Sequence, residues 1–144
     1  MTRSRERGVA AVVETSLVLP IILLVIVGTI DASRMVMSNM MLSYAVTAGA
    51  RAATAGNSTQ ANVQTVVTGA SPMLALTTSN IPTSNITTTP AGTTTASSTA
   101  TAWSARTRGD TVTVTATYTF TPSNPLFTKI GSRTFTQTSA MTIP

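Results

Sequence analysis

One carboxylate in this chain stands where a charge is costly. Glu14 interrupts the apolar run VAAVVETSLVLPIILLVIVGTI, Val9 to Ile30. If that run lies in a bilayer, an ionised carboxylate at its centre costs roughly 2.5–3.5 kcal/mol on insertion scales. Two interpretations stay open: the side chain reaches the headgroups near one end of the run, or it pairs with a positive group of another subunit. Neither interpretation makes Glu14 a catalytic residue.

Few other residues could do chemistry. The chain has no histidine, no cysteine and only four acidic residues, Glu6, Glu14, Asp31 and Asp110. Paired carboxylates, metal-ligating clusters and a Ser-His-Asp arrangement are therefore not available. A Ser-Lys dyad through Lys129 remains open, although nothing marks a partner serine. We expect no enzyme, no catalytic residue, no metal site, no cofactor and no small-molecule substrate.

The basic residues favour a topology signal over a nucleic-acid surface. The net charge is +5, and three of the nine Lys and Arg residues stand within the first seven positions, at Arg3, Arg5 and Arg7. The others are scattered, whereas nucleic-acid surfaces carry clustered basic residues. We expect no nucleic-acid partner. By the positive-inside rule, the leader holds the N-terminus in the cytoplasm.

The elements that position Glu14 begin with a membrane segment. The basic leader occupies residues 1–8, and the apolar run at residues 9–30 is about 33 Å long at about 1.5 Å per residue. This matches the roughly 30 Å hydrocarbon core of a bilayer, so we predict a transmembrane segment. A cleaved secretory signal is the competing interpretation, but Asp31-Ala32-Ser33-Arg34 is a poor cleavage site because charges crowd it.

The helical pattern continues beyond the membrane through residues 31–57, which are rich in Met and Ala. Asp31 and Arg34 are one turn apart and can pair on the helix surface. Gly56-Asn57 is the predicted end of the helix. A methionine cluster is interpreted either as an adaptable contact surface or, preferably, as ordinary packing under the outer domain. Its members are Met35, Met37, Met40 and Met41.

Residues 58–144 form the predicted Thr-rich outer domain. A short helix is expected at residues 58–70, and the polar stretch 77–102 could hold short strands such as 85–89. Strict alternation predicts two long strands at residues 110–120 and 133–143. Arg108-Gly109-Asp110 is interpreted as the turn before the first of them, rather than as the three-residue adhesion string. The predicted class is α+β, with a small antiparallel sheet packed on the helices.

Residues 5–54 resemble the TadE family of tight-adherence pilus proteins. The resemblance lies in RERG, VAAVVETSLVLPIILL, GTIDASR and AVTAGARAAT. No single piece is diagnostic, but the ordered set is much more specific: Gly8, Glu14, Pro20, Gly28, Asp31, Arg34 and Gly49-Ala50-Arg51.

The resemblance implies processing by a prepilin peptidase after Gly8, which removes the leader and exposes a new amine on Val9. In type IV pilins generally, a glutamate at the fifth mature position pairs with the amine of a neighbouring subunit. In this chain Glu14 is the sixth residue counted from Val9, because an extra valine stands in Val12-Val13.

The function implied by the resemblance is that of a minor pilin, or pseudopilin, of a Tad-type pilus, with a structural role in assembly or adhesion. Other pilins, Tad machinery subunits and the inner membrane are the implied partners. The chain would cross the inner membrane once, with its outer domain extracytoplasmic, and could also enter the cell-surface pilus. The alternative is an uncleaved single-pass scaffold or binding component of the Tad secretion machinery.

Overall fold

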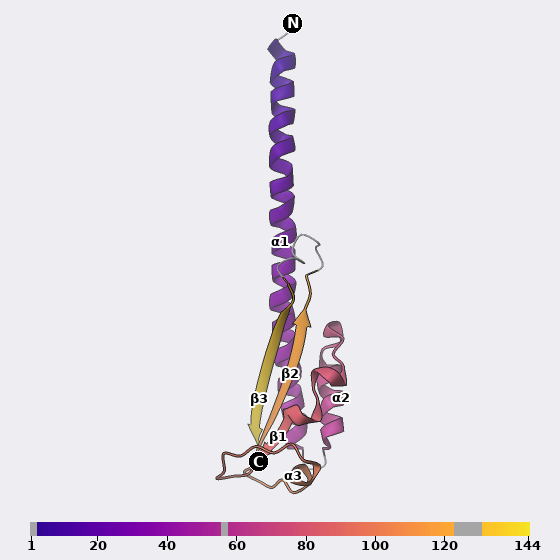
Figure 1. Cartoon of the computed structure of the whole chain (residues 1–144), viewed down its shortest axis with the longest axis vertical. Coiled ribbons are helices and arrows are strands. Elements are labelled where there is room, and N and C mark those ends of the chain that lie inside the picture. The colour runs from indigo at the N-terminus through magenta and orange to yellow at the C-terminus, as the bar shows by residue number, and fades with distance from the viewer. Residues whose placement is uncertain (1–2, 56–57, 123–130) are drawn as a thin grey trace.

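The molecule is a long helix with a small α+β domain on its C-terminal half (Figure 1). The structure is a computed structural model that describes residues 3–55, 58–122 and 131–144, with side chains from residue 11 onward. Its elements are α1 (Arg3–Thr54), α2 (Gln60–Ala70), β1 (Ile86–Thr89), α3 (Ala100–Ser104), β2 (Thr111–Phe120) and β3 (Arg133–Thr142). Three short 3-10 turns, η1 (Pro72–Leu74), η2 (Thr78–Asn80) and η3 (Thr83–Asn85), connect α2 to β1. The predicted α+β class is confirmed.

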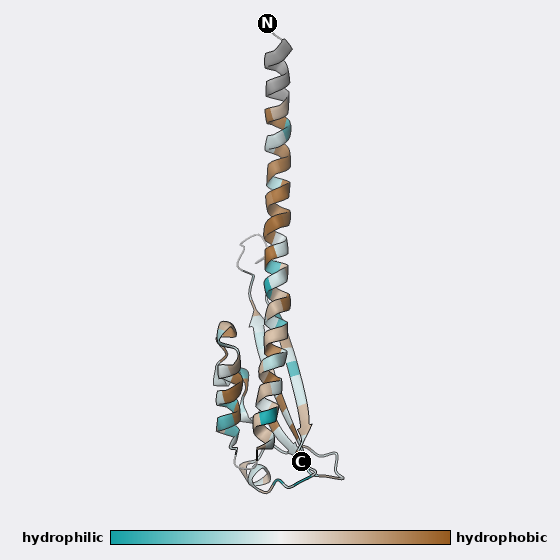
Figure 2. Cartoon of the chain, turned by 180° about the vertical axis from the view of Figure 1, so that it is seen from behind, coloured by the Kyte–Doolittle hydropathy of each residue, from teal (hydrophilic) through white to brown (hydrophobic). Residues whose placement is uncertain are grey.

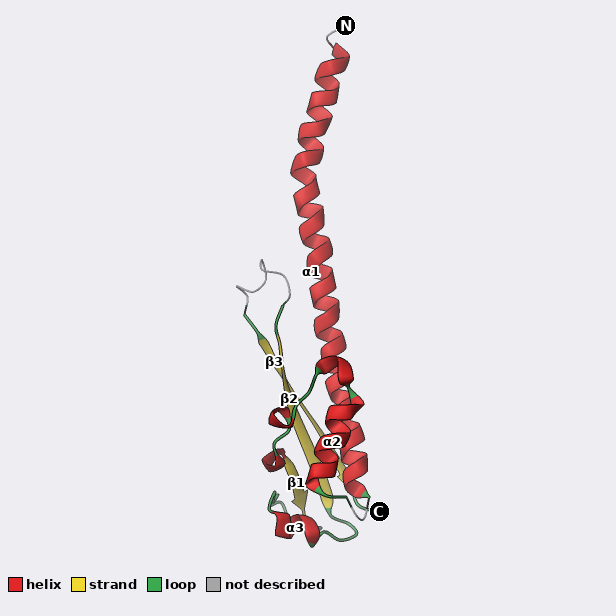
Figure 3. Cartoon of the chain, turned by 90° about the vertical axis from the view of Figure 1, so that its right-hand side faces the viewer, coloured by secondary structure: helices red, strands yellow, loops and turns green. Residues whose placement is uncertain are grey.

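Helix α1 is continuous across the predicted membrane boundary, as the sequence indicates. Pro20 lies inside it, and the helix runs through this residue with a gentle curve in its N-terminal half (Figure 3). A proline removes one backbone donor and crowds the preceding turn, so curvature of this kind is expected. The helix ends at Thr54, near the predicted end; Gly56 and Asn57 lie outside the described residues.

The sheet is antiparallel in the order β1-β2-β3. Alternation along β2 buries Val112, Val114 and Ala116 against the helices and leaves threonines on the opposite face. Strand β3 alternates in the same way, with half-buried residues such as Phe135 and Met141 facing the core. Both long strands therefore follow the predicted pattern, and the predicted short strand at 85–89 is observed as β1.

The core lies between this sheet and the helices α1 and α2 (Figure 3). From α1 it receives small and medium apolar side chains, Leu42, Ala45, Val46, Ala50 and Ala53. Gly49 stands at the closest approach, because a Cβ built on it would overlap Cγ2 of Val67 in α2. The Gly-Ala-Arg step noted in the sequence thus has a packing role: Gly49 and Ala50 are buried and Arg51 is exposed.

Helix α2 begins at Gln60, two residues after the predicted start at residue 58, and ends at the predicted Ala70. The Thr59 hydroxyl caps it by accepting a hydrogen bond from the Asn62 N–H at 3.2 Å. Val63 and Val67 are fully buried against α1. On a neighbouring side of α2, the Gln64 side-chain amide donates to the Ile81 carbonyl at 2.8 Å, which ties the helix to the loop before β1.

Helix α3 has no counterpart in the sequence prediction. It presents Trp103, whose indole N–H donates to the Ser58 carbonyl at 2.8 Å. The Arg106 guanidinium lies 4.4 Å from the Trp103 ring centroid and donates to the carbonyls of Ser58 at 2.7 Å and Ala55 at 3.2 Å. These bonds connect α3 and Arg106 to the segment between α1 and α2.

Asp110 anchors the turn before β2. Its two carboxylate oxygens accept the N–H groups of Thr107 at 2.7 Å and Ala91 at 3.0 Å. The turn itself needs Gly109, whose φ of +91° suits glycine. The predicted turn is therefore confirmed. The Asp110 carboxylate is buried, whereas an adhesion string would expose its aspartate to a partner.

Gly49→Ala should lower the free energy of unfolding by roughly 1–3 kcal/mol, because the added methyl group overpacks the contact with Val67. Gly69→Ala in α2 is the matched control, since a Cβ there meets nothing within 4 Å. That substitution should raise stability by up to about 1 kcal/mol, as alanine suits a helix better than glycine. Denaturant unfolding of the full chain in detergent measures both. Equal effects would contradict the close approach.

Stability should also fall in acid through Asp110. The N–H groups of Thr107 and then Ala91 hold the pKa of Asp110 below its ordinary value. Its stabilising contribution is therefore present above the unfolded pKa of about 3.9 and is lost as pH falls through the lower folded pKa. Asp110→Asn should lower the denaturant midpoint at pH 7 and should flatten its decline below about pH 4. Glu14→Gln is the control. If its denaturant midpoint declined in acid as little as that of Asp110→Asn, the loss of stability in acid could not be assigned to Asp110.

Candidate functional site

The N-terminal half of α1 has no covering layer in the monomer. All side chains from Ala11 to Ile26 are exposed, and Figure 2 shows mainly apolar residues along this projecting half. The stretch Ala11–Thr54 includes a window long and apolar enough to cross a membrane, and none of that window is buried. A lipid environment would cover these side chains, whereas water would leave them exposed at a high cost.

Polar side chains in this half are mostly satisfied by their own helix. The Thr15 hydroxyl donates to the Ala11 carbonyl at 2.8 Å, and the Ser16 hydroxyl donates to the Val13 carbonyl at 2.8 Å. Thr29 bonds to the Ile26 carbonyl in the same way, at 2.7 Å. Such bonds let serine and threonine enter an apolar phase without unpaired donors.

Glu14 is the exception. It is exposed, and within the described part of the chain its carboxylate has no hydrogen bond or ion pair. It lies on the helix one position before Thr15, within the candidate membrane helix. Any group that neutralises this carboxylate must therefore come from residues outside the described side chains or from another molecule. Its predicted pairing stays a prediction.

The predicted processing site is described only at the backbone. Gly8 and Val9 are helical and lie within α1, but their side chains are outside the described set. The proposed cut would therefore fall inside α1. Lys129, which the sequence left open as half of a Ser-Lys dyad, lies wholly outside the described residues.

Asp31 lies at the junction between the projecting half of α1 and the domain. Together with Phe120, Arg133 and other residues it lines a cavity of about 570 Å³ between α1 and the ends of β2 and β3. Its Oδ2 is buried without a hydrogen-bond partner. Arg34 lies one turn along α1, is exposed and has an interaction of its own. The predicted pairing of Asp31 with Arg34 therefore stays a prediction.

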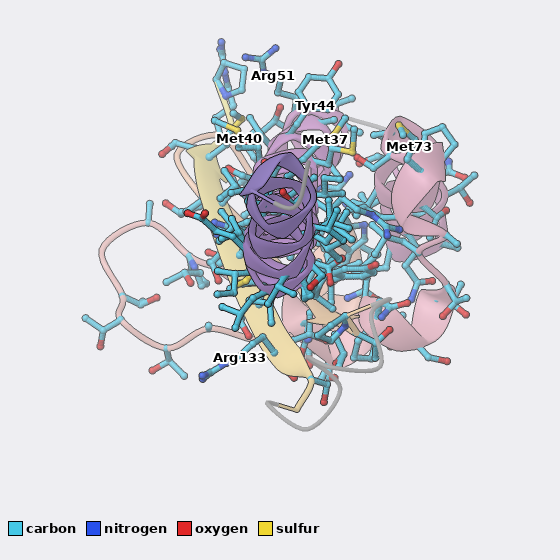
Figure 4. All side chains as sticks on the ribbon, turned by 90° about the horizontal axis from the view of Figure 1, so that it is seen from above. Met37, Met40, Tyr44, Arg51, Met73 and Arg133 are labelled. Carbon is cyan, nitrogen blue, oxygen red and sulfur yellow. The ribbon has the colours of Figure 1, made fainter. Side chains whose placement is uncertain are left out.

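The methionine cluster divides between two environments. Met41 packs against the core and Met35 is half-buried beside the cavity just described, as the packing interpretation predicts. Met37 and Met40 instead are 47 % and 69 % exposed. Figure 4 shows them on the side of α1 where Tyr44 and Met73 also lie, away from Arg133. For these two residues the preferred packing interpretation is wrong, because they point away from the sheet.

A shallow apolar groove follows from this arrangement. It measures about 490 Å³ and lies between α1 and the segment from Ala70 to Met73. Its floor includes Met41 and its rims include Tyr44 and Met73, which is 74 % exposed.

Among the described residues, no group of three or more His, Cys, Asp or Glu side chains could hold a metal ion. The apolar surface of α1 and Glu14 are thus the chemical features that stand out.

Comparison with known proteins places the family resemblance on α1. A family model described as TadE-like protein matches residues 8–51. No curated protein and no solved structure matches the chain. The matched residues run from Gly8, through Glu14 and the apolar half of α1, to the buried Gly49-Ala50 step and Arg51. Residues 8–51 hold most of the candidate membrane helix and the core residues Leu42 to Ala50, and this part of the chain is similar to the TadE-like family.

Proposed function

We propose that this protein is a minor pilin, or pseudopilin, of a Tad-type pilus, with a structural and non-enzymatic role in assembly or adhesion. The observation that carries the proposal is a TadE-like region whose helix is bare and apolar in one half and supports a compact domain in the other. The bare half would lie in the inner membrane, with the N-terminus cytoplasmic and the domain extracytoplasmic. Prepilin peptidase, other pilins and Tad machinery subunits are its proposed partners.

The charge of Glu14 supports this role. In a bilayer its carboxylate has a desolvation cost, and the described residues of its own chain supply no partner. Cleavage after Gly8 would create an ammonium group on Val9, only a few residues along the helix. The amine of a neighbouring subunit could then neutralise Glu14, so that membrane burial favours assembly over the isolated chain.

A second candidate function rests on the spacing of the same residues. Glu14 is the sixth residue counted from Val9, and one residue turns a side chain by about 100° around a helix. This offset favours a chain that keeps its leader and serves as a single-pass scaffold or binding component of the Tad machinery. The state of the N-terminus distinguishes the two functions.

Protein purified from a host with its own prepilin peptidase should lack residues 1–8. We expect this cleavage because a basic leader precedes an apolar helix. Intact mass measures it. Gly8→Leu is the matched variant, since it should keep the leader and the full-length mass. If the unaltered chain also shows the full-length mass, the scaffold function is favoured and cleavage is excluded.

Glu14→Gln should insert into the membrane at least as well as the unaltered chain, because it removes a charge that is costly in lipid. Its co-purification with pilus subunits should decrease, since the amide keeps the shape of the side chain but loses its charge. Membrane fractionation establishes equal insertion, and co-purification from the native host measures assembly.

Thr15→Val is the matched control for Glu14→Gln. Thr15 is the neighbouring exposed residue, and its hydroxyl bonds only within α1. Valine has nearly the same shape, so this variant should co-purify normally. Deleting Val13 should move Glu14 to the fifth mature position and should preserve or improve assembly. Unchanged co-purification of Glu14→Gln would mean that the carboxylate only reaches the headgroups.

A further inference from the structure

An exposed apolar stripe follows α1 across the junction between its bare half and its domain half. Beyond Ile30, the large exposed apolar residues of α1 in the described structure are Val36, Met37, Met40 and Tyr44. The last three extend a row of exposed residues with the alternating spacing of three and four that keeps side chains on one face. We call this row the outer stripe: Leu23, Ile26, Ile30, Met37, Met40 and Tyr44.

The outer stripe faces away from the domain. Leu42, Val46 and Gly49 turn the opposite side of α1 toward the sheet and α2. In the view along α1, Met37, Met40 and Tyr44 lie on one side of the helix and Arg133 of the sheet lies on the other (Figure 4). A second helix can therefore approach the stripe without meeting the sheet.

The spacing of the stripe repeats every seven residues. Ile30, Met37 and Tyr44 occupy one position of the repeat, and Ile26 and Met40 occupy the second. Ser33 falls at the second position between them, and its hydroxyl donates to the Thr29 carbonyl at 2.8 Å, so it adds no unpaired donor. A seven-residue apolar repeat is the pattern by which two helices stay in contact along their length.

The occupant of this stripe must match two environments. The part of the stripe from Leu23 to Ile30 would lie in lipid, and the part from Met37 to Tyr44 would lie in water. A soluble partner could therefore cover only the second part. A parallel helix that is apolar in the membrane and keeps an apolar stripe beyond it would cover both. The α1 helix of a second copy has this character, and copies inserted in the same membrane with the same orientation hold their helices parallel.

We propose that two copies of this chain pair in parallel, in register, through the outer stripe. About a two-fold axis along the helices, each stripe residue then meets its own counterpart. The stripe carries no charge from Leu23 to Tyr44, so like charges do not oppose the pairing. Arg51 lies further along, where its long side chain can point outward.

The groove beside the stripe fits this arrangement. Met73 stands next to Tyr44 across an apolar groove of about 490 Å³. Side chains of a second α1 would fill that groove and cover Met73, which is otherwise 74 % exposed. Methionine is flexible and polarizable, so Met40 and Met73 can adapt to the incoming helix.

Single-cysteine variants test the pairing, because the chain has no cysteine of its own. At an axis separation of about 8–10 Å and a Cα radius of about 2.3 Å, facing Cα atoms fall within disulfide range. Tyr44→Cys and Met40→Cys in the full chain should therefore form disulfide-linked dimers in oxidised native membranes. Intact mass of the product should be twice that of the chain.

Ser43→Cys is the matched control. Ser43 is exposed and adjacent to Tyr44, but it lies off the stripe, where the two Cα atoms would be farther apart than the roughly 7 Å that a disulfide allows. It should give no dimer band. Met40→Lys combined with Tyr44→Cys should abolish the dimer because two charges meet at the seam, whereas Ala61→Lys on α2 should leave it.

The inference rests on the membrane anchoring in the proposed function, but not on the pilus role, so membrane fractionation accompanies each variant. Loss of the chain from the membrane would refute the anchor and with it the pairing. If the chain stays in the membrane but Tyr44→Cys forms no dimer, the pairing is refuted and the membrane anchor is not. Equal dimer yields at residues 43 and 44, or a product with the mass of another protein, would overturn the pairing as well.

Discussion

The packing of the distal half of α1 against α2 and β2 is the contact on which the other elements depend. The outer domain is rich in threonine and serine and therefore supplies few apolar side chains of its own. Helix α1 compensates by contributing Leu42 and Val46, and Gly49 lets α2 come close enough to bury Val63 and Val67. Since small residues reduce the distance between helices, even a modest set of valines can form a dry interior. The distal half of α1 is thus part of the core of the domain and not only a linker to it.

This dependence couples the bare half of α1 to the half that carries the domain. Helix α1 is continuous from its bare half into the domain, so the orientation of the helix beyond Pro20 is coupled to the orientation of the domain. Curvature at Pro20 lies well before the domain and leaves the packed part regular (Figure 3). Arg106 and Trp103 donate to the carbonyls of Ala55 and Ser58, just beyond the far end of α1, and so connect that end to α3. Force or displacement at one end of the molecule would therefore reach the other.

Local patterns predicted most of the fold. Period-two alternation identified β2 and β3 and the residues that share each face, and helical spacing identified α2. The long apolar run and its continuation identified α1, and the resemblance located the family on the same residues. These signals succeed because each depends on neighbours within one or two turns of a helix or a few residues of a strand.

Contacts between distant segments were beyond such patterns. Helix α3 has only five residues, and what holds it is the bond from Trp103 to Ser58, far away in the sequence. The burial of Asp110 depends on the N–H of Ala91, and the exposure of Met40 depends on which side of α1 the sheet occupies. A methionine suits both a core and a surface, so its type alone could not decide between them.

The placement of the domain on one side of α1 divides the surface of the molecule into two kinds. The side with Met37, Met40 and Tyr44 is apolar and continuous with the bare half of the helix. The outer face of the sheet, farthest from α1, carries threonines, and hydroxyl pairs such as Thr115 with Thr138 link its strands at 2.9 Å. Threonine favours strands and keeps its hydroxyl in water, so this face stays hydrated with almost no charge. Contacts through α1 would therefore leave the threonine face of the sheet outermost, where its hydroxyl groups meet the solvent.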